Sequence, residues 1–150
     1  MSLAIVRALI AVIGSALLVA PSVLAQGGIA DVKLAEGKQV AGAVLRALQQ
    51  CLQTKGPGSS CTLAEVGALA NVNRTNGATP DGRWFVAPGA ALTLSGGGSP
   101  VMSGSVLVSG AAGRDTNGLA VSLYVSPGGN TFRCETRSGV PPGPGGGQSC

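Results

Sequence analysis

Apolar residues fill nearly the whole N-terminal stretch of the chain. Residues 3–25 form an apolar run in which Arg7 is the only charge. One interpretation is a secretory signal peptide, with a short basic start, an apolar centre and small residues before cleavage after Ala25. The other is a retained hydrophobic stem, because about 20 apolar residues suffice to cross a bilayer core. Both interpretations predict that the rest of the chain is exported.

A helical pattern follows the glycine pair Gly27-Gly28. Asp31 can cap a helix whose apolar residues recur every three or four positions, and the sequence Gly56-Pro57-Gly58 ends it after Lys55. We predict one long amphipathic helix over residues 31–55, with one side packed against a partner surface. The apolar positions are Val40, Val44, Ala47, Leu48, Cys51 and Leu52. A short second helix is predicted from Thr62, because Thr62-Leu63-Ala64-Glu65 has the capping-box pattern.

The pattern changes to strict alternation further along the chain. Residues 119–125 place Leu119, Val121, Leu123 and Val125 on one face, as expected for a half-buried strand. Short glycine-rich separators favour antiparallel connections over crossover helices. We therefore predict an α+β domain over 26–150, with the helix packed on an antiparallel sheet of about four to five strands spanning 83–136. The predicted strands are 83–86, 90–94, 101–108, 119–125 and 131–136.

The chain has four cysteines and no histidine, an even count that predicts two disulfides in an exported protein. Cys51 in the last helical turn and Cys61 just beyond the loop form one predicted pair. The other is Cys134 with Cys150, which would hold the Gly- and Pro-rich loop 137–150 against the sheet. Alternatively the tail is flexible, and its final cysteine is unpaired or bonds another molecule. These spacings lack zinc knuckles, so no metal or cofactor is expected.

The charges and the missing histidine argue against two classes of function, nucleic-acid binding and catalysis. The net charge is +4, and the charges are scattered singly, which argues against a nucleic-acid partner. Without histidine, Ser-His-Asp and Cys-His mechanisms are excluded, so we predict that the chain is not an enzyme and has no catalytic residues. The carboxylates are dispersed along the sequence: Asp31, Glu36, Glu65, Asp81, Asp115 and Glu135.

Two local sequences have functional interpretations. Asn73-Arg74-Thr75 matches the acceptor pattern for N-linked glycosylation, with Asn73 as the candidate site in an exposed, turn-rich segment. Trp84-Phe85 could form a ligand-stacking edge. We favour a core role for both rings because the chain has so few aromatic residues.

This order of parts resembles a type IV pilin, pseudopilin or minor pilin. Ile10-Ala11-Val12-Ile13-Gly14 followed by Ala20-Pro21 is similar to the apolar stem of that family. The helix end at Thr54-Lys55-Gly56 is also similar, as is Thr131-Phe132-Arg133-Cys134 with the closing Cys150. Where the family carries a glutamate soon after its mature start, this chain has Ile5 if Met1 begins the mature protein.

The resemblance implies a structural subunit of an extracellular filament (fimbrium) or secretion pseudopilus. Its partners would be copies of itself or other pilin-like subunits, and it would lie in the inner membrane before assembly if the stem is retained. The residues expected to form the assembly helix are Leu3, Ile10, Ile13, Leu17 and Leu18. The alternative is a soluble exported binding or adhesion module released by signal-peptide cleavage. The expected location is the cell surface, an extracellular filament or the periplasm.

Overall fold

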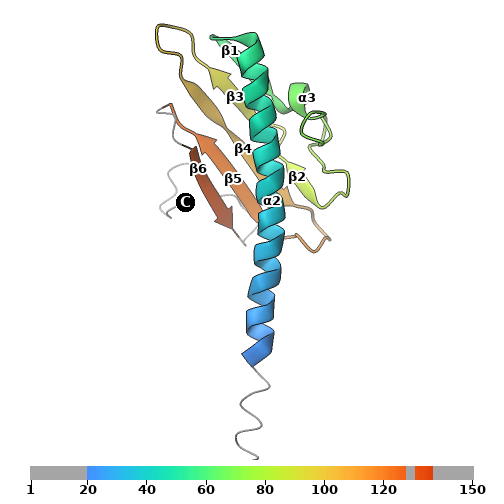
Figure 1. Cartoon of the computed structure of the whole chain (residues 1–150). Helices are drawn as coiled ribbons and strands as arrows, with labels where there is room; N and C mark the ends of the chain where they lie inside the picture. Colours follow the sequence, from blue (N-terminus) through green and yellow to red (C-terminus); the bar gives the residue numbers. More distant parts are fainter. Residues whose placement is uncertain (1–19, 128–130, 137–150) are drawn as a thin grey trace, which may run out of the picture. The chain divides into compact units, whose positions relative to one another are not determined.

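The computed structural model of the chain describes residues 20–127 and 131–136 (Figure 1). Two compact units divide the chain, residues 1–32 and residues 33–150. Helix α2 (Ala20–Lys55) contributes residues to both. The sheet and the short helix α3 (Leu63–Val66) belong to the second unit.

Helix α2 begins earlier than predicted. Asp31 lies inside the helix rather than at its N-cap, and the helix passes through Gly27-Gly28 without a break. A glycine inside a helix costs only about 1 kcal/mol relative to alanine, which is too little to stop a long helix. The predicted end at Lys55 is confirmed. Gly56 has the left-handed φ of +82°, and its N–H donates to the carbonyl of Leu52 at 2.8 Å.

A single antiparallel sheet of six strands forms the other layer. Strands β1, β3, β4, β5 and β6 lie in that order across it. Strand β2 pairs with β4 along the same edge as β3, because β5 occupies the opposite edge of β4. The bounds are β1 Ser59–Thr62, β2 Trp84–Val86, β3 Ala91–Leu94, β4 Met102–Gly110, β5 Ala120–Val125 and β6 Thr131–Thr136.

The predicted α+β class, with one long helix on an antiparallel sheet, is confirmed, and all five predicted strands form. The predicted limits of the sheet were wrong, because β1 adds a sixth strand starting at Ser59. This strand reads Ser-Ser-Cys-Thr and carries no apolar alternation, so the pattern gave no sign of it. The capping-box residues do begin a helix, but α3 has only one turn.

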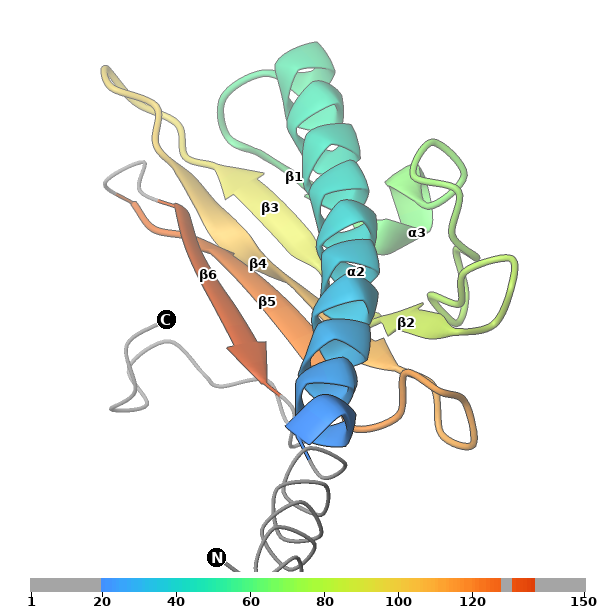
Figure 2. The same cartoon turned by 60° about the horizontal axis from the view of Figure 1, so that its bottom comes forward.

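Within the second unit, α2 lies across one face of the sheet (Figures 1 and 2). Val44, Leu48 and Leu52 of the helix are fully buried, and so are Val106, Val108 and Val121 of the sheet. The buried residues of the two layers form one continuous cluster. The alternation seen in the sequence of β4 and β5 therefore marks the face that the helix covers.

Trp84 shows how closely the two layers approach. Its indole is completely buried and lies against Gly37 of α2. A Cβ atom at Gly37 would lie 2.8 Å from Cη2 of the indole, closer than such atoms pack. The core role predicted for Trp84 is confirmed. The same prediction for Phe85 was wrong, because neighbouring strand residues face opposite sides of the sheet and Phe85 is 39% exposed.

Candidate functional site

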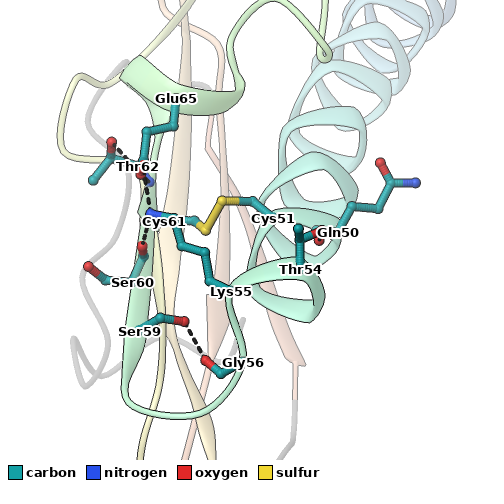
Figure 3. Close-up of a disulfide and its surroundings, with 10 residues drawn as sticks. All are labelled: Gln50, Cys51, Thr54, Lys55, Gly56, Ser59, Ser60, Cys61, Thr62 and Glu65. Carbon is teal, nitrogen blue, oxygen red and sulfur yellow. Dashed lines mark hydrogen bonds and ion pairs between the residues drawn. A yellow bond between two sulfur atoms is a disulfide. The ribbon is translucent and has the colours of Figure 1, made fainter.

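The end of α2 is bonded covalently to the edge of the sheet. Cys51 and Cys61 form the predicted disulfide, with Cα atoms 6.1 Å apart (Figure 3). Cys61 of β1 is fully buried, whereas Cys51 is partly exposed. A disulfide across a loop of this length limits the freedom of the unfolded chain. The bond therefore fixes β1, the strand without an apolar pattern, against the helix.

Polar contacts reinforce this disulfide junction (Figure 3). The Glu65 carboxylate binds the Lys55 ammonium and accepts a hydrogen bond from the Thr62 backbone N–H at 2.9 Å. The Lys55 ammonium also donates to the Ser60 carbonyl at 2.9 Å. The hydrogen bond from Lys55, followed by that from Thr62, lowers the pKa of Glu65. Glu65 therefore stays ionised and links α2, β1 and α3.

Cys51, Cys61 and Glu65 also bring three potential metal-ligand atoms, two sulfurs and a carboxylate oxygen, within 4.8 Å of one another. Cysteine binds zinc as its thiolate. Here the two sulfurs are bonded to each other, so they are not thiolates. The cluster acts as a covalent junction in this oxidised state.

A charged cluster lies where α2 meets the β4–β5 loop. Arg83 binds Asp115 through two hydrogen bonds of 3.2 and 3.0 Å, and its Nη1 lies 2.9 Å from Oε2 of Glu36. Lys33 donates to the Asp115 carbonyl at 2.8 Å. The hydrogen bonds from Arg83 lower the pKa of Asp115, and in return Asp115 raises the pKa of Arg83. The dispersed carboxylates Glu36 and Asp115 thus meet at one arginine.

This cluster is suited to holding elements together. A general acid in glycoside hydrolysis needs a raised pKa, whereas the arginine stabilises the ionised form of Asp115. The backbone of Arg83 is fixed as well, since its carbonyl accepts a 2.6 Å hydrogen bond from the buried Thr116 hydroxyl. A second, smaller set joins Lys38 of α2 to Glu135 of β6 at 2.8 Å.

The segment between α3 and β2 carries the candidate glycosylation site. Asn73, Arg74 and Thr75 are all exposed, as predicted for an acceptor sequence. Asn73 borders an open depression of about 360 Å³. The lining residues are Ala68, Asn71, Val72, Asn73, Ala78, Thr79 and Pro80.

Besides Phe85, three large apolar side chains in the described part of the chain are exposed. Ile29 and Val32 of α2, in the first unit, are 55% and 72% exposed. Leu69, in the segment after α3, is 72% exposed. Ile29 and Val32 lie four and seven residues after the end of the N-terminal apolar run at Ala25. Helix periodicity over 31–55 did not reveal this connection.

Several predicted sites lie outside the described residues, either entirely or in one of their members. The expected assembly positions Leu3, Ile10, Ile13, Leu17 and Leu18 are among them, as is the loop 137–150. Cys134 is disulfide-bonded, but its predicted partner Cys150 also lies outside, so that pairing stays a prediction.

Comparison of the chain with known protein families, curated proteins and solved structures finds no match. None of the helices in residues 20–127 and 131–136 combines the length and apolar character needed to cross a membrane. The function of the chain is therefore inferred from its own sequence and geometry.

Proposed function

We propose that this protein is a structural subunit of an extracellular filament or secretion pseudopilus, assembled through its N-terminal apolar segment. The single observation that carries the proposal is the 36-residue helix α2, which continues the apolar run at one end and packs on the sheet at the other. A subunit of this kind needs one part for assembly and one part for the outer surface.

The physical basis of assembly is burial of apolar surface. Removing apolar area from water contributes about 25 cal/mol for each Å². Residues 3–25 are far more apolar than the polar side of α2, and copies that pack these segments together would bury them. One head-to-tail contact repeated between copies gives a helical polymer. In the described part of α2, Ile29 and Val32 add two exposed apolar side chains.

The sheet layer is suited to an exposed and durable role. Its junction with α2 is reinforced by the Cys51–Cys61 disulfide and by the ion pairs of Arg83 and Glu135. Disulfides persist in oxidising compartments, which supports an exported location. The candidate site residues thus act in covalent and packing roles.

The alternative is a soluble exported binding or adhesion module, from which residues 1–25 are removed. The open depression beside Asn73 favours this second function, because it gives the loop surface a place for a small polar ligand. The two functions differ in one respect: only the filament subunit keeps the apolar segment.

Filament formation by the full chain tests the proposal. The exported protein is sedimented and examined by electron microscopy, alongside the Leu17→Ser variant and the matched Gln50→Ser variant, at equal exported amounts. Leu17 belongs to the apolar run, whereas Gln50 is an exposed residue on α2. We expect filaments from the wild-type chain and from Gln50→Ser, and at least a tenfold loss in Leu17→Ser. A wild-type chain that stays monomeric would contradict the proposal.

A further inference from the structure

We propose that Asn73 is a site of N-linked glycosylation on the folded protein, an inference that does not depend on filament assembly. Asn73-Arg74-Thr75 is the one Asn-x-Ser/Thr sequence in the 150 residues, so only Asn73 can accept an N-linked glycan. All three residues are exposed. The described fold therefore presents the whole acceptor sequence to solvent.

The local hydrogen bonds fix the orientation of the Asn73 carboxamide. Its Oδ1 accepts from the backbone N–H of Thr75 at 2.8 Å and from that of Asn76 at 3.1 Å. Both bonds use the oxygen and turn it into the loop. Within the described part of the chain, Nδ2 has no hydrogen-bond partner. The reactive Nδ2 atom is thus free of hydrogen bonds within the described residues, whereas Oδ1 accepts two.

The backbone of the loop is fixed too. The Asn73 N–H donates to the Ala78 carbonyl at 2.9 Å, and the Gly77 N–H donates to the Asn73 carbonyl at 2.8 Å. Gly77 in turn accepts a 2.9 Å hydrogen bond from Val86 of β2. A Cβ atom at Gly77 would lie 1.9 Å from the Val86 carbonyl oxygen, so this close approach requires glycine. The acceptor loop is a formed part of the fold.

Space and polarity beside the acceptor suit a sugar. The open depression that Asn73 borders is lined by Asn71 and Thr79 as well as by apolar Val72 and Pro80. The exposed Asn71 amide can hydrogen-bond to a sugar hydroxyl, and the exposed Pro80 ring can contact the C–H face of the sugar. The Thr79 hydroxyl already binds Asp81 and Trp84, and Val72 is buried. The first sugar of an attached glycan can therefore lie against this depression.

The reaction is transfer of an oligosaccharide from a lipid pyrophosphate donor. Nδ2 of Asn73 attacks the anomeric carbon, so that a carbon–nitrogen bond forms and the bond from that carbon to the pyrophosphate oxygen breaks. The lipid pyrophosphate leaves with the electron pair, and the amide proton goes to a base of the transferase. No oxidant or reductant is involved. Such transferases require a serine or threonine two residues after the asparagine, and Thr75 occupies that position.

The test uses the purified, disulfide-bonded full chain with a solubilised oligosaccharyltransferase and its lipid-linked oligosaccharide. A reduced and denatured sample runs in parallel, and intact mass and peptide mapping locate the product. We expect the folded chain to gain one glycan, at Asn73. The Asn73→Gln and Thr75→Ala variants should lose it completely, and Thr75→Ser should retain it.

Thr75→Ala is the matched control, because Thr75 contacts Asn73 through its backbone N–H, which alanine keeps. Its unfolding midpoint should equal that of the wild-type chain, which separates loss of the acceptor from loss of the loop. Modification of the denatured chain alone would overturn the proposal, since the fold would then block the site. Absence of a glycan from both the folded and the denatured sample would also overturn the proposal, as would a glycan on the Thr75→Ala variant.

Discussion

At the residue scale, the contact between Gly37 and Trp84 sets how near the helix lies to the sheet. The indole is fully buried, so it cannot swing away to make room for a larger helical residue. Interiors are packed too densely for an added methyl group to be absorbed without cost. The glycine is therefore a packing requirement, although glycine weakens the helix itself.

We predict that Gly37→Ala destabilises the protein by about 1–3 kcal/mol, because the new methyl group collides with the indole of Trp84. Gly42→Ala is the matched control. It lies in the same helix with nothing within 4 Å of its added Cβ, and it should stabilise the protein by about 0.5–1 kcal/mol. Urea unfolding measures both. Equal effects of the two substitutions would show that Trp84 does not restrict this contact.

The ion pairs of Asp115 give the molecule a specific response to acid. Because the hydrogen bonds from Arg83 lower the pKa of Asp115, its contribution to stability is complete above the ordinary carboxyl pKa, near pH 4. That contribution is lost as the pH falls through the lowered pKa of the folded state. We predict that the urea midpoint of Asp115→Asn falls less steeply between pH 5 and about pH 2 than that of the wild-type chain. Parallel curves for the two proteins would contradict the assigned role of this ion pair.

At the element scale, the sequence pattern predicted what burial determines and missed what local contacts determine. Apolar residues alternate along β2 to β5, and their buried members belong to the same core cluster as those of α2. Strand β1 has no such pattern, and its position depends on pairing with β3 and on the Cys51–Cys61 bond. The predicted helix start at Asp31 is wrong. Asp31 and the glycine pair resemble helix-start signals, but the free energy that a cap or a glycine contributes is too small to end a long helix.

The disulfide should matter for stability more than any single ion pair. We predict that Cys51→Ala/Cys61→Ala lowers the free energy of unfolding by about 2–3 kcal/mol, from the loop entropy that the bond removes. Lys55→Met, which breaks the exposed pair with Glu65, should cost at most about 1 kcal/mol. Thermal and urea unfolding compare them. A double variant as stable as the wild-type chain would show that β1 needs no covalent attachment.

At the scale of the whole molecule, the candidate sites were predictable to different degrees. The Cys51–Cys61 pair and the exposure of Asn73 followed from short sequence spacing and turn residues. The meeting of Glu36, Arg83 and Asp115 did not, because these residues are separated by up to 79 positions and only the packing of α2 beside the β4–β5 loop joins them. No periodicity reports such contacts between distant elements.

The exposed apolar residues of α2 provide a test of self-association. We predict that Val32→Ser reduces self-association of the full chain and leaves its unfolding free energy within about 0.5 kcal/mol, because Val32 is exposed in the single chain. Leu69→Ser is the matched control, since Leu69 is equally exposed but lies away from the apolar run in sequence. Sedimentation velocity measures association. A larger effect of Leu69→Ser would place the contact on the loop instead.

The most direct test of the central claim is the N-terminal sequence and intact mass of the mature protein recovered from the exported fraction. If the chain is a filament subunit, the recovered protein retains the apolar residues from 3 to 25 and sediments as a polymer. Recovery of a monomer that begins at Gln26 would contradict the account and identify the chain as a soluble exported module.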